Sequence, residues 1–196
     1  MLTQNLVFVG ISLQLIGQIT YVRSIIKGHA KPNLVSWVIW MLAPFIGTFF
    51  LLKAGTGLSV LPVFMAGFGP FLVIITALLV KNGFWKIQKF DIYCGVLSVL
   101  SLLCYIFTQN LGISIFFAIF SDTLAGVPTI IKSWKFPETE SGIIYFLAMV
   151  SNIIGLLTLK IWSFSTAAFG VFVTLQCVLI LLAIHRKKIT SIFSRT

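Results

Sequence analysis

Acidic side chains are scarce in this sequence. Only four of its 196 residues are Asp or Glu, against 14 Lys and Arg, and charged residues together make up 9% of the chain. Soluble domains carry roughly 25% charged residues, whereas 59% of this chain is hydrophobic and its mean hydropathy is +1.08. The shortage of charge argues against a water-soluble globule and predicts an integral membrane protein.

Cysteine and histidine are too few, and too scattered, for several kinds of site. Cys94, Cys104 and Cys177 fall inside apolar runs without metal-ligand spacing, and His29 and His185 lie in basic flanks. The pattern predicts neither a disulfide framework nor a metal site, and we expect no cofactor. There is also no histidine or pair of acids inside an apolar run and no Gly-x-Ser-x-Gly motif, so we expect no catalytic residues and no enzyme.

Long apolar runs dominate what remains. A helix needs about 20 apolar residues to cross the hydrocarbon of a bilayer, and seven stretches qualify. The predicted spans are 4–24, 33–53, 58–80, 91–108, 111–132, 141–160 and 164–185. The fourth and fifth are separated only by "TQNLG", so a six-span alternative merges or drops the fourth.

The basic residues alternate along this series of spans. With the N-terminus outside, twelve of the 14 fall in cytoplasmic segments and only Lys53 and Lys160 lie outside. This bias follows the positive-inside rule and supports seven spans with the C-terminus inside. Because the charge lies at span ends rather than on an exposed domain, we expect the lipid bilayer, and no nucleic acid, as a partner. Short outer loops without glycosylation sequons favour a bacterial cytoplasmic membrane.

One phrase occurs twice. "SIIKGHAKP" begins at Ser24 and "TIIKSWKFP" at Thr129, 105 residues later, each running from the end of one predicted span into the next. Further matches at the same offset are Pro32 with Pro137, Ser36 with Ser141, Trp40 with Tyr145, and Leu42 with Leu147. The first three spans therefore look like a copy of the last three.

Two copies of three spans need one extra span between them to run parallel, and the fourth supplies it. The predicted organisation is a first three-helix bundle (1–80), a basic loop and linker helix (81–110), a second bundle (111–186) and a cytoplasmic tail (187–196). Parallel repeats of this kind are a recurrent plan of transporters, which bind solute near mid-bilayer between the repeats.

The architecture and the second phrase resemble the SWEET and PQ-loop superfamily. "GVPTIIKSWKFPETES" (126–141) is similar to a PQ-loop, with Pro128 and Thr129 where the family has Pro-Gln, while the first copy has Arg23 at the position of the proline. The resemblance implies a 3+1+3 membrane transporter in which a proline helps a helix to bend. Because proline removes a helical hydrogen bond, we expect hinges at Pro44, Pro70 and Pro128.

Several polar residues lie at mid-span depth. Asp122 is the only acid in the interior of a span, since Asp91 stands at the very start of the fourth. A carboxylate at this depth must face a cavity, find a donor or take up a proton. We expect it to bind substrate and to couple transport to protons. The other predicted substrate-binding residues are Gln14 and Gln18, one turn apart, together with Asn152, Gln176 and Trp40. The alternative for each polar residue is a structural hydrogen bond between helices. We interpret Trp37, one turn nearer the cytoplasm than Trp40, as a residue of the aromatic belt at the membrane–water interface.

These features favour a transporter of a small polar solute, such as a sugar, amino acid or vitamin, working by alternating access. The alternative is a non-transporting receptor or scaffold of the same architecture. The short loops leave little surface for a protein partner, which favours transport. The oligomeric state stays open.

Overall fold

The protein is all-helical. The computed structural model describes residues 6–53, 61–81, 83–108, 110–159 and 161–193, which contain seven α-helices and one short 3-10 helix. These are α1 (Leu6–Ile26), α2 (Leu34–Lys53), α3 (Leu61–Leu79), α4 (Lys89–Phe107), α5 (Leu111–Lys135), η2 (Pro137–Thr139), α6 (Gly142–Leu157) and α7 (Phe164–Phe193).

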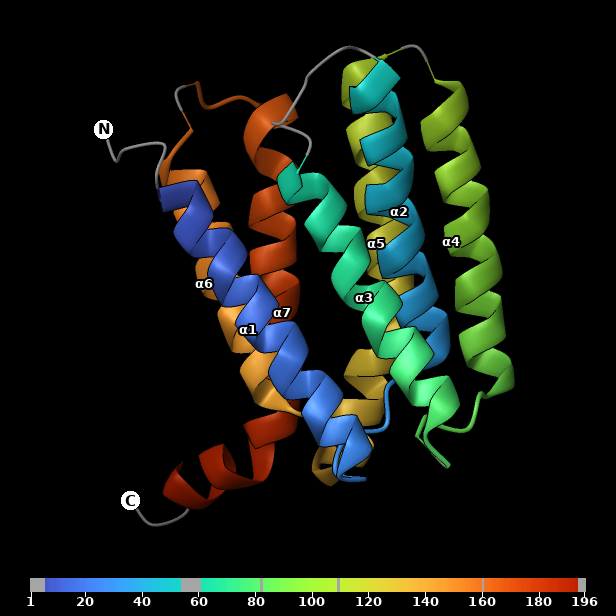
Figure 1. The fold of residues 1–196 in the computed structure, drawn as a ribbon, viewed down its shortest axis with the longest axis vertical. Helices are drawn as coiled ribbons and strands as arrows, with labels where there is room; N and C mark the ends of the chain where they lie inside the picture. The colour runs from blue at the N-terminus through green and yellow to red at the C-terminus, as the bar shows by residue number, and fades with distance from the viewer. Residues whose placement is uncertain (1–5, 54–60, 82, 109, 160, 194–196) are drawn as a thin grey trace.

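Each predicted span corresponds to one α-helix, with boundaries shifted by a few residues. The largest difference is at the C-terminal end, where the predicted span stops at 185 but α7 continues to Phe193. Most of the segment expected to be a tail is therefore helical, and its last turns run sideways from the bundle (Figure 1). Parts of the expected spans, such as 58–60, lie outside the described residues.

Successive helices run in alternating directions, so the connections gather at two ends (Figure 1). We call the end where α1, α3 and α5 finish and α2, α4 and α6 begin the lysine-bearing end, because Lys27, Lys31, Lys86, Lys132 and Lys135 lie on or beside its connections. The N-terminus of α1 lies at the opposite end. The arrangement agrees with the predicted clustering of positive charge.

The helices form two groups of three that contact one another in the same way. Within the described residues, α3 packs against both α1 and α2, and α7 packs against both α5 and α6. Between the groups, α1 packs against α6 and α2 against α5. Exchanging the two groups, helix for helix, leaves this pattern unchanged.

A glycine makes the two repeated phrases end their helices differently. Gly28 has a φ of 74°, a left-handed conformation that closes α1, and its N–H donates to the carbonyl of Ile25 at 2.8 Å. The corresponding residue of the second phrase is Ser133, which stays helical, so that α5 runs on to Lys135. As a result Lys27 is exposed beyond its helix, whereas Lys132 is held inside α5 and is only 3% exposed.

Helix α4 is attached to the second group by small polar residues. The hydroxyls of Ser98 and Ser121 each donate to the other's carbonyl, at 3.0 and 2.9 Å, and Ser101 donates to the carbonyl of Phe117 at 2.8 Å. Such bonds and close packing are what associate helices in lipid, where burial of apolar surface gives no advantage.

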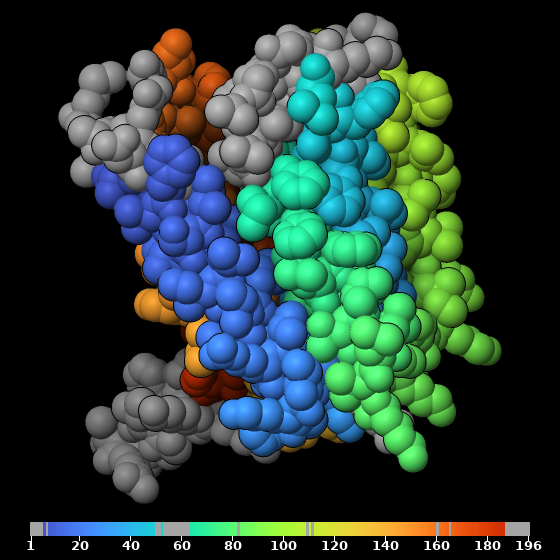
Figure 2. Space-filling view, viewed as in Figure 1, coloured from blue at the N-terminus to red at the C-terminus, as the bar shows by residue number. Residues whose placement is uncertain are grey.

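The outer surface is apolar. On the face in Figure 2 the side chains of α1, α3 and α2 lie side by side, and large hydrophobic residues are more than half exposed on most of the helices, among them Phe8, Ile16, Leu79, Tyr93, Phe107, Phe116, Ile143 and Leu175. Among the described residues, four helices are long and apolar enough to cross a membrane (Phe8–Ile26, Lys89–Phe107, Gly112–Lys135 and Thr166–Arg186), and three shorter apolar helices accompany them. These properties are those of a membrane-embedded protein.

Candidate functional site

A cavity of about 510 Å³ lies between the two groups of helices. Its size falls within the range of small-molecule sites. All six residues predicted from the sequence to bind substrate line it: Gln14, Gln18, Trp40, Asp122, Asn152 and Gln176. They come from α1, α2, α5, α6 and α7, so the fold brings together residues that are up to 162 positions apart in the chain. Whether they bind a ligand stays a prediction.

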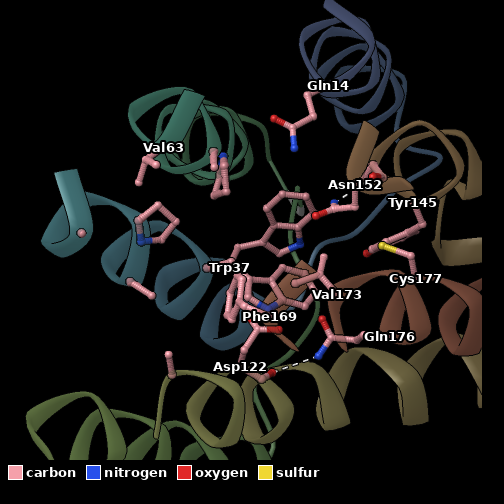
Figure 3. Close-up of a pocket in the computed structure, with 18 of the residues that line it drawn as sticks. Gln14, Trp37, Val63, Asp122, Tyr145, Asn152, Phe169, Val173, Gln176 and Cys177 are labelled. Atoms are coloured by element: carbon pink, nitrogen blue, oxygen red, sulfur yellow. Dashed lines mark hydrogen bonds between the residues drawn. The ribbon is translucent and has the colours of Figure 1, made fainter. Parts of the chain in front are cut away.

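Asp122 and Gln176 form one wall of the cavity (Figure 3). The Gln176 amide Nε2 donates to the backbone carbonyl of Asp122 at 3.0 Å. The Asp122 side chain is only 9% exposed, and its Oδ2 has no hydrogen-bond partner among the described residues. The wall therefore presents a carboxyl group with one acceptor atom unused.

Gln14 and Asn152 face this wall from α1 and α6 (Figure 3). Asn152 Nδ2 donates to the carbonyl of Ala148, one turn earlier in its own helix, at 2.9 Å. Gln18, one turn below Gln14, has a buried Oε1 without a partner in the described part of the chain. The amides thus leave a mixture of donors and acceptors toward the cavity.

Two glycines create the space in which two glutamines lie. A Cβ placed at Gly69 of α3 would overlap the amide of Gln18, and a Cβ at Gly126 of α5 would overlap the amide of Gln176. In the first group, Gln18 of α1 therefore lies against Gly69 of α3. In the second group, Gln176 of α7 lies against Gly126 of α5. This supporting role was not predicted from the sequence, because it depends on how the helices pack.

Trp37 corrects one sequence-based interpretation. We expected a membrane-interface residue, yet its side chain is 2% exposed and lines the cavity beside Trp40, with the two ring centroids 5.4 Å apart. The indole Nε1 atoms of both have no partner among the described residues. The two residues are three positions apart, which is close to one helical turn, so they lie on the same side of α2, and this side faces the cavity. This spacing was the signal in the sequence from which a place for Trp37 beside Trp40 could have been predicted.

The three proposed hinge prolines all lie inside helices. Pro44 of α2 and Pro70 of α3 line the cavity, whereas Pro128 of α5 does not. Tyr145, the position that matches Trp40 in the second phrase, lines the cavity as well. Proline within these helices removes backbone hydrogen bonds close to the cavity, but motion about them remains a prediction.

At the lysine-bearing end of the bundle, buried polar and charged side chains that do not line the cavity join the two groups of helices. Lys132 Nζ lies 2.8 Å from Glu140 Oε1, with side chains 2% and 0% exposed. Tyr21 of α1 donates its hydroxyl to Glu140 Oε2 at 2.7 Å. Lys132 also donates to the backbone carbonyls of Lys31 and Thr139. We call Tyr21, Lys132 and Glu140 the closing cluster.

The closing cluster is in contact with the lining of the cavity. The Tyr21 ring lies 4.9 Å from that of Trp37, centroid to centroid. Nearby, Thr129 of α5 donates to Ser36 of α2 at 2.9 Å, a second polar contact between the groups. Neither the burial of Lys132 nor a role for Glu140 was predicted from the sequence, because a pairing of this kind depends on how α5 turns back toward α6.

The remaining chemistry of the described residues is limited. They contain no group of three or more His, Cys, Asp or Glu side chains that could hold a metal ion, and Cys94, Cys104 and Cys177 are free thiols. Comparison of the chain with protein-family models, with curated proteins and with solved structures found no match.

Proposed function

We propose that this protein carries a small solute across a membrane by alternating access between its two groups of three helices. The observation that carries the proposal is the cavity: a space of about 510 Å³ between the groups, lined by residues of both. A binding site at the interface of two helical repeats is the arrangement that such transporters use.

The packing pattern supports two parallel repeats. Exchange of α1, α2 and α3 with α5, α6 and α7 preserves which helices pack against one another within and between the groups, and it pairs the helices that carry the two repeated sequence phrases. We infer a pseudo-two-fold axis along the membrane normal, with α4 as the linker, seven membrane spans and the lysine-bearing end on the cytoplasmic side. This is the plan implied by the resemblance to SWEET and PQ-loop proteins.

The closing cluster supports a mechanism with two states. It joins α1 of one group to the α5–α6 connection of the other, and in the proposed mechanism these contacts close the site toward the lysine-bearing end. Release of these contacts, with tilting of one group against the other, would open the cavity to that end. Asp122 would then bind solute or a coupling proton at the centre.

Uptake into liposomes tests the proposal. Purified protein would be reconstituted, and accumulation of labelled sugars, amino acids, amines and vitamins measured with and without a proton gradient. We expect saturable uptake of one class of solute, and its loss in Ala148→Phe, which fills the cavity. Val96→Phe adds the same ring to the exposed face of α4 and should leave uptake unchanged.

If no solute is taken up and none stabilises the protein against heat, transport is the wrong function. The non-transporting receptor or scaffold would then be the better interpretation, since anything that binds the folded protein must stabilise it.

A further inference from the structure

We propose, resting on the transport function above, that the solute is an organic cation with little other polar surface, exchanged for a proton at Asp122. Four features of the cavity lead to this class of solute: its charge, its mostly apolar lining, its aromatic side chains and the isolation of its single carboxyl group.

The described lining of the cavity contains an acidic side chain but no basic one. Asp122 is the only acid among the described residues that line the cavity, and none of them is Lys, Arg or His. The nearest buried cation of α5, Lys132, is engaged by Glu140 outside the cavity. An isolated buried carboxylate is very costly, so Asp122 must hold either a proton or a cation supplied by the ligand. An anionic ligand would meet no positive group.

Most of the lining is apolar. Fourteen of the 24 described lining residues have no polar side-chain atom. Of the amides, Gln176 and Asn152 already donate to backbone carbonyls. The unpartnered buried atoms of the described lining are Gln18 Oε1, the indole N–H groups of Trp37 and Trp40, Asp122 Oδ2 and the Tyr145 hydroxyl. A ligand hydroxyl that meets the apolar part of the lining instead stays without a partner, which costs about 1–3 kcal/mol. A compact ligand with one charged group fits better.

Aromatic side chains provide the second element of cation binding. Trp37, Trp40, Tyr105, Tyr145 and Phe169 line the cavity. The face of an aromatic ring attracts an ammonium group, most strongly for tryptophan and in desolvated sites. The unpartnered indole N–H groups and Gln18 Oε1 can pair with one further polar group of the ligand.

The surroundings of Asp122 allow proton exchange without a second charged group. The other titratable side chains lining the cavity are Tyr105 from α4, Tyr145 from α6 and Cys177 from α7, which are neutral in their ordinary forms. On α4 the charged residues are Lys89 and Asp91. The Ser98 hydroxyl donates to the carbonyl of Ser121, next to Asp122, so Ser98 marks the height of Asp122 on α4. Asp91 lies seven residues from Ser98, which is about 10 Å along the helix.

The remaining helices packed on α5 place their charges farther away. The charged side chains of α7, beginning with His185, start nine residues beyond Gln176, about 13 Å along the helix. The one charged residue of α2, Lys53, ends that helix at the opposite end of the bundle.

Since one carboxyl group can hold the proton or the ligand's cation but not both, the proton and the ligand must compete for Asp122. A cation that binds displaces one proton.

The test uses three ligands of matched shape and different charge: tryptamine (cation), tryptophol (neutral) and indole-3-propionate (anion). Binding to the purified full-length protein would be measured by calorimetry and by thermal stabilisation between pH 6 and 8, where tryptamine stays protonated. We expect tryptamine to bind at least tenfold more tightly than either analogue. Its Kd should fall as pH rises, by up to tenfold per unit, and calorimetry in buffers of different ionisation enthalpy should detect one released proton.

Variants assign the effect to the cavity. In Asp122→Asn we expect the preference for tryptamine, its pH dependence and the proton release to disappear, with tryptophol binding retained. Asp91→Asn removes the same charge from a buried acid outside the cavity and should bind all three ligands like the unmodified protein. If Asp122→Asn fails to fold, Ala148→Phe must abolish tryptamine binding.

Three outcomes would overturn the inference. These are equal binding of tryptamine and tryptophol, binding of tryptamine that is independent of pH, and a preference for tryptamine that persists in Asp122→Asn. If sugars or amino acids are taken up in liposomes while tryptamine does not bind, only the proposed class of solute is wrong. If nothing is taken up or bound, the transport function fails with it.

Discussion

Lys132 and Glu140 form an ion pair in which Nζ and Oε1 lie 2.8 Å apart and both side chains are almost fully buried. Lys132 occupies the last turns of α5, and Glu140 lies just before α6, so the pair closes the connection between the two helices. Through Tyr21 the same carboxylate reaches α1, in the other group of helices. One ion pair thus joins a local turn to the contact between the proposed repeats.

We predict that removing one partner of this pair is far more damaging than removing both. Glu140→Gln leaves Lys132 buried without its anion, and breaking a buried pair in this way typically costs about 3–5 kcal/mol. The double variant Lys132→Met with Glu140→Gln should recover most of that loss, because no unpaired charge remains. Thermal unfolding in detergent would measure both. Glu138→Gln, on the exposed side of the same turn, is the control; an unchanged melting temperature in Glu140→Gln would contradict the prediction.

Gly126→Ala should weaken ligand binding through Gln176. The added methyl group takes the space of the Gln176 amide, so the side chain must swing away from Asp122. Gly155→Ala is the control, since a Cβ there meets nothing within 4 Å, and it should stabilise α6 by about 0.5–1 kcal/mol. Gly69→Ala should act on Gln18 in the same way, with an added cost because it precedes Pro70. Unaltered affinity in Gly126→Ala, measured by calorimetry, would show that Gln176 does not need this position.

Pro44→Ala and Pro128→Ala should slow transport without weakening binding. Alanine restores the backbone hydrogen bond that proline removes, so each helix becomes straighter and the protein more stable to heat. If bending at these positions is part of alternating access, the turnover rate in liposomes should fall several-fold while the Kd for the solute stays the same. Pro62→Ala is the control, because a proline at the second position of α3 interrupts no helical bond. Faster or unchanged turnover would make the prolines static kinks.

The lysine-bearing end should face the cytoplasm. A green fluorescent protein fused after Thr196 would fluoresce in bacteria, because that reporter matures in the cytoplasm but not after export through the general secretory pathway. A phosphatase fused at the same position should be inactive. The expectation follows from the position of twelve of the 14 basic residues. An active phosphatase with a dark fluorescent fusion would invert the topology.

The helical architecture was predictable because it depends on local properties of the chain. Runs of about 20 apolar residues form helices in lipid, where backbone groups have no other partners, and the breaks between them carry glycine, proline and charge. The same argument located the mid-span polar residues, since depth follows from position along a helix. It did not predict the extension of α7, whose last turns are not apolar enough to be recognised as part of a span.

The sequence by itself determined the membrane character, the seven helices, the repeated phrase and the depth of Asp122, Asn152, Gln176 and the α1 glutamines. Tertiary structure alone decided that these side chains share one cavity, that Trp37 lies in it, and that Lys132 is buried against Glu140. The reason is physical. Periodicity along one helix fixes the height of a side chain, but its facing direction and its neighbours depend on how separate helices pack, and here that packing joins α1 to α6 and α2 to α5.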